Sequence, residues 1–337
     1  MTGVELAPVR EAAGRGESSP VLDIQALSVR FRLGRSGRRG IVAAVTEVDL
    51  ALRPGRVLVL VGESGCGKSV LASALLGLLP ANAEVRGRAM LAVPGTARRD
   101  LLAASERELA GGVRGRLVGL VPQSAASHLT PVRTAGAQLA EAVGVLRPRA
   151  VLEEVVAGLA EQVGLPIDAL DRYPHELSGG MAQRVGVALA LAGDPPVVLA
   201  DEPTTGLDRP LVDRTVDLLA RLAAEEGRAV LMITHDLRAA RRVATDVAVM
   251  YASRLVEVGP AAAVFDDPAH PYTAGLLAAL PSGGFRPIPG HPPELTALPT
   301  GCGFHPRCPV ADDGRCSGDP ALVRSGDRLV ACRRVPC

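Results

Sequence analysis

The chain has 337 residues, which suffices for one large domain with an appendage or for two domains. Apolar residues make up 47% of the chain and aromatic residues only 2%, so we expect a core of Ala, Val and Leu. The formal net charge of +1 argues against a nucleic-acid partner, since such surfaces usually carry a strong positive excess.

The N-terminal segment is polar and contains Gly and Pro, so we expect residues 1–20 to be disordered. It lacks the apolar stretch of a secretion signal. No apolar run approaches the roughly 18 residues that are needed to span a bilayer. We therefore expect a cytosolic protein that is held at a membrane only through a partner.

Two strands are predicted next, at residues 21–32 and 41–52, and a basic glycine-rich turn separates them. Phe31 in the first strand is one of four Phe residues in the chain. It could stack on an adenine ring, or it could belong to the core. The sequence leaves both interpretations open.

The stretch from Gly62 to Ser69 reads GESGCGKS, the spacing of a phosphate-binding loop. The apolar run 57–61 before it predicts a buried parallel strand, and a helix is predicted from Lys68 to Pro80. Glycines let backbone N–H groups surround a polyphosphate, Lys68 can neutralise its β and γ phosphates, and the Ser69 hydroxyl can bind Mg²⁺. The predicted nucleotide-binding residues are Gly62, Ser64, Gly65, Cys66, Gly67, Lys68, Ser69 and Val70.

Further strands are predicted at 117–121, 197–202 and 229–233, and helices alternate with them, which indicates a mostly parallel sheet. Polar residues stand at the ends of these strands, where ligands bind in open α/β sheets: Gln123, Asp201, Glu202 and His235. Asp201 is placed to hold Mg²⁺, and Glu202 to orient and deprotonate an attacking water. His235 can contact the γ-phosphate, whereas Gln123 by itself establishes no role.

A helical segment is predicted to be inserted at residues 124–176, and the sequence Leu177-Ser178-Gly179-Gly180 follows it at the start of another helix. A serine and two glycines at a helix start form an anion site. Because the chain already has one phosphate site, a second one suggests that it serves the nucleotide of another molecule.

The tail ends in Cys337, and four further cysteines lie in its Pro- and Gly-rich part, at Cys302, Cys308, Cys316 and Cys332. The gaps between them are five, seven and fifteen residues, and no C-x-x-C pair occurs, which disfavours a zinc ribbon. Four thiolates in a loop-rich cytosolic segment suit an iron–sulfur cluster. Zinc and four unliganded thiols remain the alternatives.

From about residue 22 to its end, the chain resembles the ATP-binding subunit of an ABC transporter. GESGCGKS resembles the Walker A motif, VVLADE the Walker B motif, LSGGM the family signature, VPQ the Q-loop, TGLD the D-loop and THD the switch histidine. Met181 departs from the commonest glutamine of the signature, as it does in the oligopeptide branch, so we expect no loss of activity. The tail motifs FDDPAHPYT, LLAALP, PGHPP and GCGFHPRCP resemble the oligopeptide, dipeptide and nickel importer branch.

The resemblance implies an α/β fold with a P-loop NTPase (RecA-like) core and an antiparallel β subdomain. The ABC ATPase domain would cover residues 21–258, with an inserted helical subdomain at about 124–180. A loop-rich C-terminal extension with the cysteine cluster would cover residues 259–337.

The resemblance also implies that two such domains pair head to tail, with each ATP between the Walker A motif of one chain and the signature of the other. Ser178 and Gly180, beside Gly179, would then contact the γ-phosphate of the partner's ATP, and Asp208 would lie at the interface. Glu202 would be the catalytic base and His235 the γ-phosphate contact. Gln123 would act in catalysis, join Ser69 and Asp201 at Mg²⁺, and signal to membrane subunits. Some members of this branch carry a 4Fe–4S cluster on cysteines that match Cys302, Cys308, Cys316 and Cys332.

The function that follows is ATP hydrolysis to power an importer of peptides, at the cytoplasmic face of the cell membrane. The implied partners are a second ABC ATPase subunit, identical or paralogous, two membrane permease subunits and, indirectly, an extracytoplasmic solute-binding protein. Nickel or another small solute is the alternative cargo. A soluble ABC ATPase acting on nucleic acid or ribosomes is the competing class, but a single module with near-zero charge favours the transporter.

Overall fold

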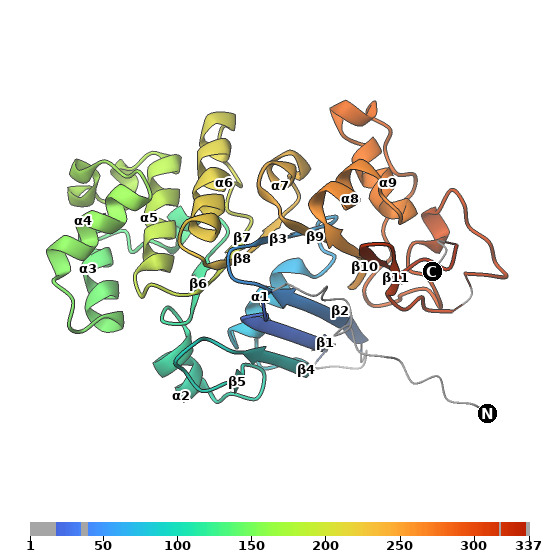
Figure 1. Cartoon of the computed structure of the whole chain (residues 1–337), viewed down its shortest axis with the longest axis horizontal. Helices are drawn as coiled ribbons and strands as arrows, with labels where there is room; N and C mark the ends of the chain where they lie inside the picture. The colour runs from blue at the N-terminus through green and yellow to red at the C-terminus, as the bar shows by residue number, and fades with distance from the viewer. Residues whose placement is uncertain (1–17, 35–39, 317, 335–337) are drawn as a thin grey trace.

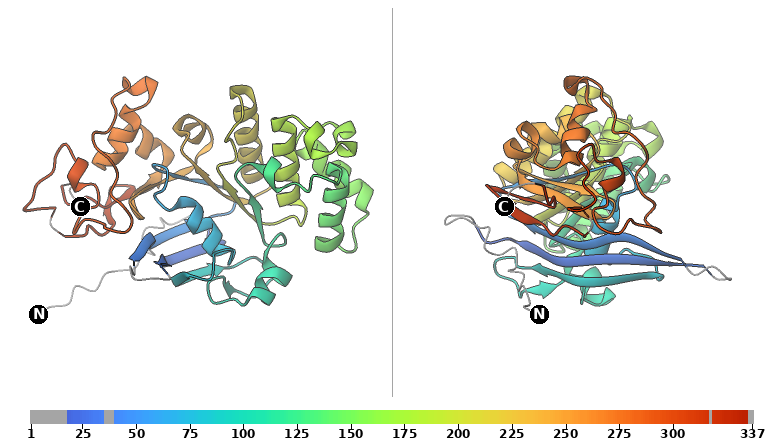
Figure 2. Two further views of the ribbon diagram at one scale, coloured as in Figure 1. Left: turned by 180° about the vertical axis from the view of Figure 1, so that it is seen from behind. Right: turned by 90° about the vertical axis from the view of Figure 1, so that its right-hand side faces the viewer.

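A computed structural model of the chain describes residues 18–34, 40–316 and 318–334. Most of the segment that we expect to be disordered, residues 1–20, lies outside these ranges, as does Cys337. The described chain contains two sheets that lie as separate layers, with helices around the larger one (Figure 1, Figure 2).

The smaller sheet is antiparallel and has the strand order β2-β1-β4-β5. Its strands are β1 (Leu22–Leu33), β2 (Gly40–Leu52), β4 (Ala83–Leu91) and β5 (Arg99–Asp100). One face of this sheet packs on helix α1 (Lys68–Leu75), where Leu71 and Leu75 share a core with Leu22 and Leu27. The antiparallel subdomain therefore lies against the helix that follows the phosphate loop.

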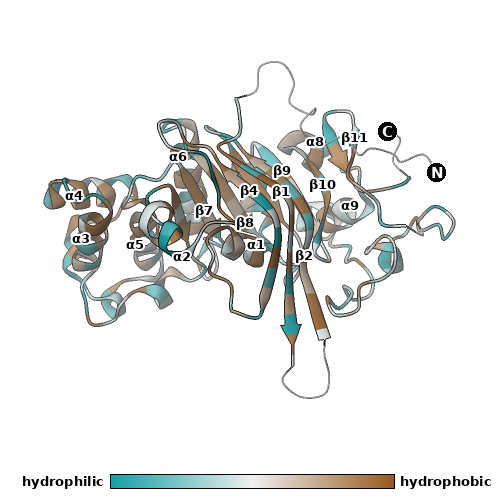
Figure 3. Ribbon diagram, turned by 90° about the horizontal axis from the view of Figure 1, so that it is seen from below, coloured by the Kyte–Doolittle hydropathy of each residue, from teal (hydrophilic) through white to brown (hydrophobic). Residues whose placement is uncertain are grey.

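The larger sheet has the order β11-β12-β10-β9-β3-β8-β7-β6. Its strands are β3 (Val57–Val61), β6 (Val118–Val121), β7 (Val197–Asp201), β8 (Ala229–Thr234), β9 (Asp246–Tyr251), β10 (Arg254–Pro260), β11 (Val323–Ser325) and β12 (Arg328–Val330). Strands β9, β3, β8, β7 and β6 are parallel, whereas β10, β12 and β11 continue the sheet as antiparallel strands. The predicted fold class is confirmed, with the parallel core at the centre of the molecule (Figure 3).

Strand β3 is buried on both faces, as its uninterrupted apolar sequence predicts. Val57, Val59 and Val61 point to the core under α5 (Gly179–Leu191), α6 (Arg209–Ala224) and α7 (Leu237–Val243). Leu58 and Leu60 point to the opposite core, which contains α1 and the antiparallel sheet. This alternation fixes the end of β3, and thus the loop that follows it, between the two layers.

Helices α3 (Ala135–Leu146) and α4 (Leu152–Gln162) pack with α5 into a helical lobe at one side of the core (Figure 1). The short elements are α2 (Glu106–Glu108), η2 (Leu109–Val113), η3 (Ala125–His128), η4 (Ile167–Asp171), η5 (Pro174–Glu176), α8 (Ala261–Asp266), α9 (Pro271–Ala278), η6 (Pro281–Gly283) and η7 (His305–Arg307). Within the ranges that the structure describes, no helix is long and apolar enough to cross a membrane.

One local prediction differs from the structure. Helix α1 ends at Leu75 and not at Pro80, because Gly77 takes a φ of +63° and the N–H of Leu78 turns back to the Ser73 carbonyl. The tail is loop-rich, as its composition predicts, and its regular elements include α8, α9 and the β11–β12 pair. The limits expected for the three domains stay predictions.

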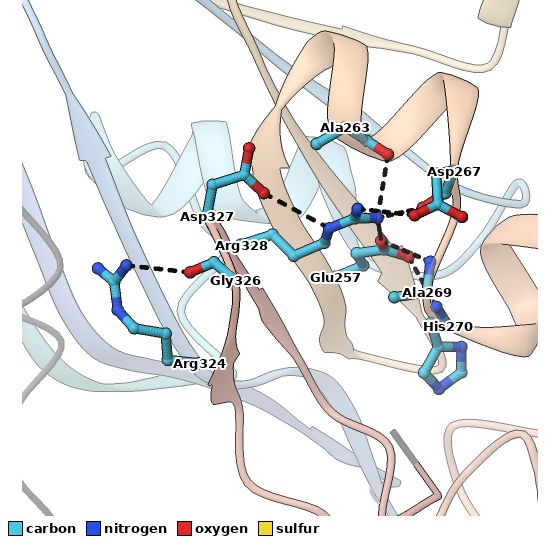
Figure 4. Close-up of polar contacts among 9 residues, drawn as sticks. All are labelled: Glu257, Ala263, Asp267, Ala269, His270, Arg324, Gly326, Asp327 and Arg328. Atoms are coloured by element: carbon cyan, nitrogen blue, oxygen red, sulfur yellow. Dashed lines mark hydrogen bonds and ion pairs between the residues drawn. The ribbon is translucent and has the colours of Figure 1, made fainter. Parts of the chain in front are cut away.

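A buried ion pair ties the tail to the core sheet (Figure 4). Glu257 on β10 is fully buried and accepts hydrogen bonds from the backbone N–H groups of Ala269 and His270, both 2.9 Å long. Arg328 on β12 lies 3.3 Å from Glu257 Oε1 and donates to the Ala263 carbonyl. The Glu257 carboxylate therefore joins β10, β12 and the turn before α9.

We expect Arg328→Ala to destabilise this junction by about 3 kcal/mol, because it leaves Glu257 as a buried carboxylate without its cation. Hydrogen exchange of the β10 and β12 amides measures the loss as faster local opening. Arg324→Ala is the matched control, since Arg324 is exposed and donates to the Gly326 carbonyl. Equal protection in Arg328→Ala and in the wild type would contradict the expectation.

Candidate functional site

The phosphate loop lies at the carboxyl end of β3, and its glycines are required by close backbone contacts. A Cβ atom on Gly62 would lie 2.1 Å from the Met250 carbonyl oxygen, and one on Gly67 would lie 1.9 Å from the Ala44 carbonyl oxygen. Both residues also have positive φ, +155° for Gly62 and +110° for Gly67. No other residue type fits either position, so the loop can take this path only with glycine.

Lys68 is buried at the start of α1, and its ammonium group is held by the loop itself. Its Nζ donates to the carbonyl oxygens of Gly62 and Glu63, at 2.8 and 3.0 Å. The cation thus stands inside the curve of the loop without a carboxylate partner among the described residues. A polyphosphate can supply the missing negative charge.

Cys66 is also buried in this loop, and burial raises the pKa of its thiol. The thiol is then protonated near neutral pH, which makes it a weak nucleophile. Its place in the loop is consistent with a role for its backbone.

Ser69 and Asp201 bring two oxygen ligands together from opposite sides of the site. The Ser69 hydroxyl donates to Asp201 Oδ1 at 2.9 Å, and Asp201 is the last residue of β7. Burial raises the pKa of the Asp201 carboxyl, although the hydrogen bond from Ser69 acts in the opposite direction. A hydroxyl and a carboxylate in contact suit Mg²⁺, which prefers oxygen ligands. Gln123 follows β6, and its side chain is exposed and forms no hydrogen bond with any residue that the structure describes.

Glu202 and His235 meet where β7 and β8 end. Glu202 is buried with a φ of +48°, and its Oε2 lies 2.8 Å from His235 Nδ1. This buried oxygen is in ion-pair contact with His235 and accepts no other hydrogen bond from the described part of the chain. A buried carboxylate oxygen that lacks a further donor can receive one from a water molecule and can take its proton.

The signature turn begins α5 in the helical lobe, apart from the phosphate loop that precedes α1 (Figure 1). Ser178 caps this helix, and its hydroxyl accepts from the Met181 N–H at 3.2 Å. Gly179 and Gly180 are the first residues of α5, so their N–H groups are at its positive end. The structure therefore does not bring these residues to the chain's own loop.

Two further predicted residues, Asp208 and Phe31, lie on segments other than the phosphate loop. Asp208 precedes α6, where it is exposed and makes no side-chain capping bond. Phe31 is half-buried on β1 and packs against the core of the antiparallel sheet.

Sequence reasoning missed three residues that contact each other at the loop: Glu63, Tyr272 and Arg307. Arg307 forms a double ion pair with Glu63, and the Tyr272 hydroxyl accepts from the Glu63 N–H. The sequence signal that could have found them is the scarcity of aromatic residues. Three of the few that the chain has, Tyr251, Tyr272 and Phe304, pack against each other beside the loop.

The four tail cysteines, Cys302, Cys308, Cys316 and Cys332, line one cavity together with His270 and Phe304. All four are free thiols, and burial raises the pKa of Cys302 and Cys308. However, no group of three or more His, Cys, Asp or Glu side chains in the described ranges is arranged to hold a metal ion. The structure thus gives the predicted metal or cluster no direct support.

Comparison with known proteins identifies the class. Residues 45–205 match the family described as ABC transporter, and residues 256–316 match the oligopeptide/dipeptide transporter C-terminal region. The chain belongs to the ABC transporter family, as the sequence motifs predict. Its tail places it with the oligopeptide and dipeptide branch of that family.

Relatives and solved structures agree with this placement. A putative peptide import ATP-binding protein of Brucella ovis is 39% identical over 321 residues, which cover 90% of this chain and 94% of that protein. The probable D,D-dipeptide transport ATP-binding protein DdpD of Escherichia coli is 38% identical over 324 residues, covering 94% of this chain and 96% of that protein. The dimeric ATP-binding cassette MJ0796, bound to ADP and Pi, matches with a TM-score of 0.59 and 24% identity, over 71% of this chain and 98% of that one. At that identity the likeness supports the fold.

We expect Asp201→Asn to stabilise the nucleotide-free protein near neutral pH, because burial raises the pKa of this carboxyl above its ordinary 3.8 and so disfavours its charged form. The gain should shrink as the pH falls toward 3.8, where the unfolded chain also binds the proton. Urea unfolding between about pH 4 and pH 7.5 measures it.

Ser69→Ala is the matched control for this prediction, because it removes the hydrogen bond to Asp201 but keeps the carboxylate. That variant should gain no stability. An Asp201→Asn protein that is less stable than the wild type near neutral pH would refute the expectation.

Proposed function

We propose that the chain is the ATP-binding and ATP-hydrolysing subunit of an ABC importer for peptides. The observation that carries the proposal is the buried Glu202 oxygen without a further hydrogen-bond donor in the described chain, beside His235 and next to the Ser69–Asp201 pair. Peptide cargo is favoured by the matching C-terminal region and by the names of the relatives. Nickel or another small solute remains the alternative cargo.

Each group of residues around the loop would have its own role in ATP hydrolysis. The loop amides of Gly62 and of residues 64–70, together with the Lys68 ammonium, would bind the phosphates of ATP. Ser69 and Asp201, with Gln123, would hold Mg²⁺, which neutralises the charge of the phosphates when it is bound. Glu202 would orient and deprotonate the attacking water, and His235 would contact the γ-phosphate. Phe31 is the proposed adenine contact.

A second ABC ATPase subunit would complete the site. Ser178, Gly179 and Gly180 form an anion site at a helix start that contacts no nucleotide-binding loop of its own chain. Asp208, which precedes α6, is exposed and suits an interface. Head-to-tail pairing would place this turn against the ATP of the partner, whether that partner is identical or paralogous.

Membrane permease subunits are the proposed partners of the helical lobe, at the cytoplasmic face of the membrane. The lobe exposes several large apolar side chains that a permease subunit would cover: Val132, Val145, Val151, Leu152 and Ile167. The solute-binding protein would act only through the permease. In domain terms we propose an ATPase domain at 21–258 with the lobe at 124–180, and an extension at 259–337.

We also propose that Cys302, Cys308, Cys316 and Cys332 hold a 4Fe–4S cluster, with zinc or free thiols as the alternatives. The support is that all four thiols line one cavity in a segment with few elements of its own. A cluster distributes four thiolates over four irons, so it needs a shared cavity and not a tight set of ligands around one ion. When bound, the cluster would supply folding energy to this segment.

We expect Glu202→Gln to lower the rate of ATP hydrolysis by at least about a hundredfold, because glutamine cannot take the proton of the attacking water. ATP affinity should change little, since the phosphate loop stays intact. Phosphate release and equilibrium binding of ATP measure the two effects. Glu225→Gln, the same change at the exposed end of α6, should keep the wild-type rate. Hydrolysis at the wild-type rate in Glu202→Gln would remove Glu202 from this role.

We expect anaerobically purified protein to contain iron and to absorb near ~400 nm, and Cys308→Ser to lose most of both, because thiolates hold such clusters. Iron analysis and absorption spectra measure this. Cys66→Ala is the control, since Cys66 lies in the phosphate loop and not in the cysteine-lined cavity. A wild-type protein that is folded, colourless and free of iron would contradict the cluster.

A further inference from the structure

Glu63, the second residue of the phosphate loop, is bound through three of its polar groups at once. Its carboxylate forms a double ion pair with Arg307, with distances of 2.8 Å to Oε2 and 3.0 Å to Oε1. Its N–H donates to the Tyr272 hydroxyl at 2.9 Å, and its carbonyl accepts from Lys68 at 3.0 Å. This one residue therefore connects the C-terminal extension to the lysine that faces the phosphates.

The Arg307 guanidinium is fixed before any ligand binds. Only 5% of its side chain is exposed, and its Nε donates to the Pro289 carbonyl at 2.9 Å. The group also donates to the Tyr251 hydroxyl and lies 5.7 Å from the centre of that ring. A rigid fork of this kind holds a carboxylate in one orientation, which a flexible lysine does not.

Tyr272 is equally fixed, from the side of α9. It is fully buried, and its ring packs 4.4 Å from the ring of Tyr251 and 5.4 Å from that of Phe304, measured between centroids. Its own N–H donates to His270 Nδ1, and the His270 N–H donates to the buried Glu257 carboxylate. A continuous set of hydrogen bonds thus leads from β10 to the phosphate loop, and Figure 4 shows its starting point at Glu257.

These contacts determine which loop groups remain for the nucleotide. The Glu63 N–H donates to the Tyr272 hydroxyl and so cannot donate to a phosphate, and the Cys66 N–H donates to the Glu63 carbonyl at 3.4 Å. The Glu63 carbonyl and the Gly62 carbonyl hold Lys68 inside the curve of the loop. Fixing Glu63 therefore fixes both the start of the loop and the position of its cation.

We propose that Arg307 and Tyr272 are positioning residues for nucleotide binding: the C-terminal extension holds Glu63 and keeps the phosphate loop in its binding conformation before ATP arrives. The proposal rests on the proposed function, since it assigns a task within the same ATP site. Its consequence is energetic. A loop that is already ordered loses little conformational entropy on binding, whereas a loosened loop must be ordered by the ligand at the expense of affinity.

The test uses Tyr272→Phe, which removes one oxygen and keeps the aromatic packing, and Arg307→Met, which removes the charge. We expect the Kd for ATP, measured without Mg²⁺, to rise about fivefold in Tyr272→Phe, the value of one hydrogen bond. The KM for ATP should rise with it. The kcat at saturating ATP should stay within about twofold, because bound ATP orders the loop itself. Arg307→Lys should recover part of the affinity that Arg307→Met loses.

A double-mutant cycle separates loop positioning from a general loosening of the extension. Glu63→Gln and Arg307→Met break the same ion pair, so their effects on Kd should not add. Arg324→Ala, in the same extension but away from the loop, should leave Kd unchanged. A wild type that binds no ATP would refute the proposed function. A wild type that binds ATP, with folded Tyr272→Phe and Arg307→Met proteins of unchanged Kd, would refute this inference alone, and so would a fall in kcat without a change in Kd.

Discussion

Two backbone carbonyl groups, one from each sheet, constrain the phosphate loop because they leave no room for a side chain at two of its glycines. The Met250 carbonyl on β9 lies against Gly62, and the Ala44 carbonyl on β2 lies against Gly67. Ser253, which precedes β10, links β2 to the phosphate loop. Its carbonyl accepts from the Thr46 N–H, its hydroxyl hydrogen-bonds the Thr46 hydroxyl, and its N–H donates to the Cys66 carbonyl. The shape of the nucleotide site therefore depends on how the antiparallel sheet packs on the parallel core.

Local sequence patterns were sufficient to predict the site residues that stand at the ends of strands. Asp201, Glu202 and His235 follow buried apolar runs, and parallel strands deliver their carboxyl ends to one edge of a sheet. The contacts of Glu63 could not be predicted in this way, because its partners Tyr272 and Arg307 are 209 and 244 residues away. No spacing rule connects positions at such distances, and only the packing of the tail on the core creates the contacts.

The same limit applies to the tail itself. Its Pro and Gly content predicts loops, which fill most of the described tail, but composition does not report the short helices α8 and α9. Nor does it report that the Glu257 carboxylate on β10 accepts the two N–H groups before α9. In helix α1 the apolar run continues beyond Leu75, but Gly77 turns the chain. A buried carboxylate and a glycine with positive φ are features that apolar periodicity does not report.

The short helix η7 of the extension lies between the phosphate loop and the cysteine-lined cavity. Arg307 lies in η7, between Cys302 and Cys308, so the residue that holds the phosphate loop is next in sequence to a thiol of the cysteine-lined cavity. Phe304 packs between these features and touches both Tyr251 and Tyr272. The cysteine-lined cavity and the contact with the phosphate loop therefore share one short segment of chain.

The position of β12 has a consequence for the solubility of shortened chains. Strand β12 pairs with β10 through Val330 and Leu329, and β11 covers β12 in turn. A protein truncated before Val323 would leave β10 as the outermost strand, with unpaired N–H and C=O groups and with Glu257 deprived of Arg328. Such an open edge pairs with strands from other molecules, so β11 and β12 protect the core sheet from aggregation.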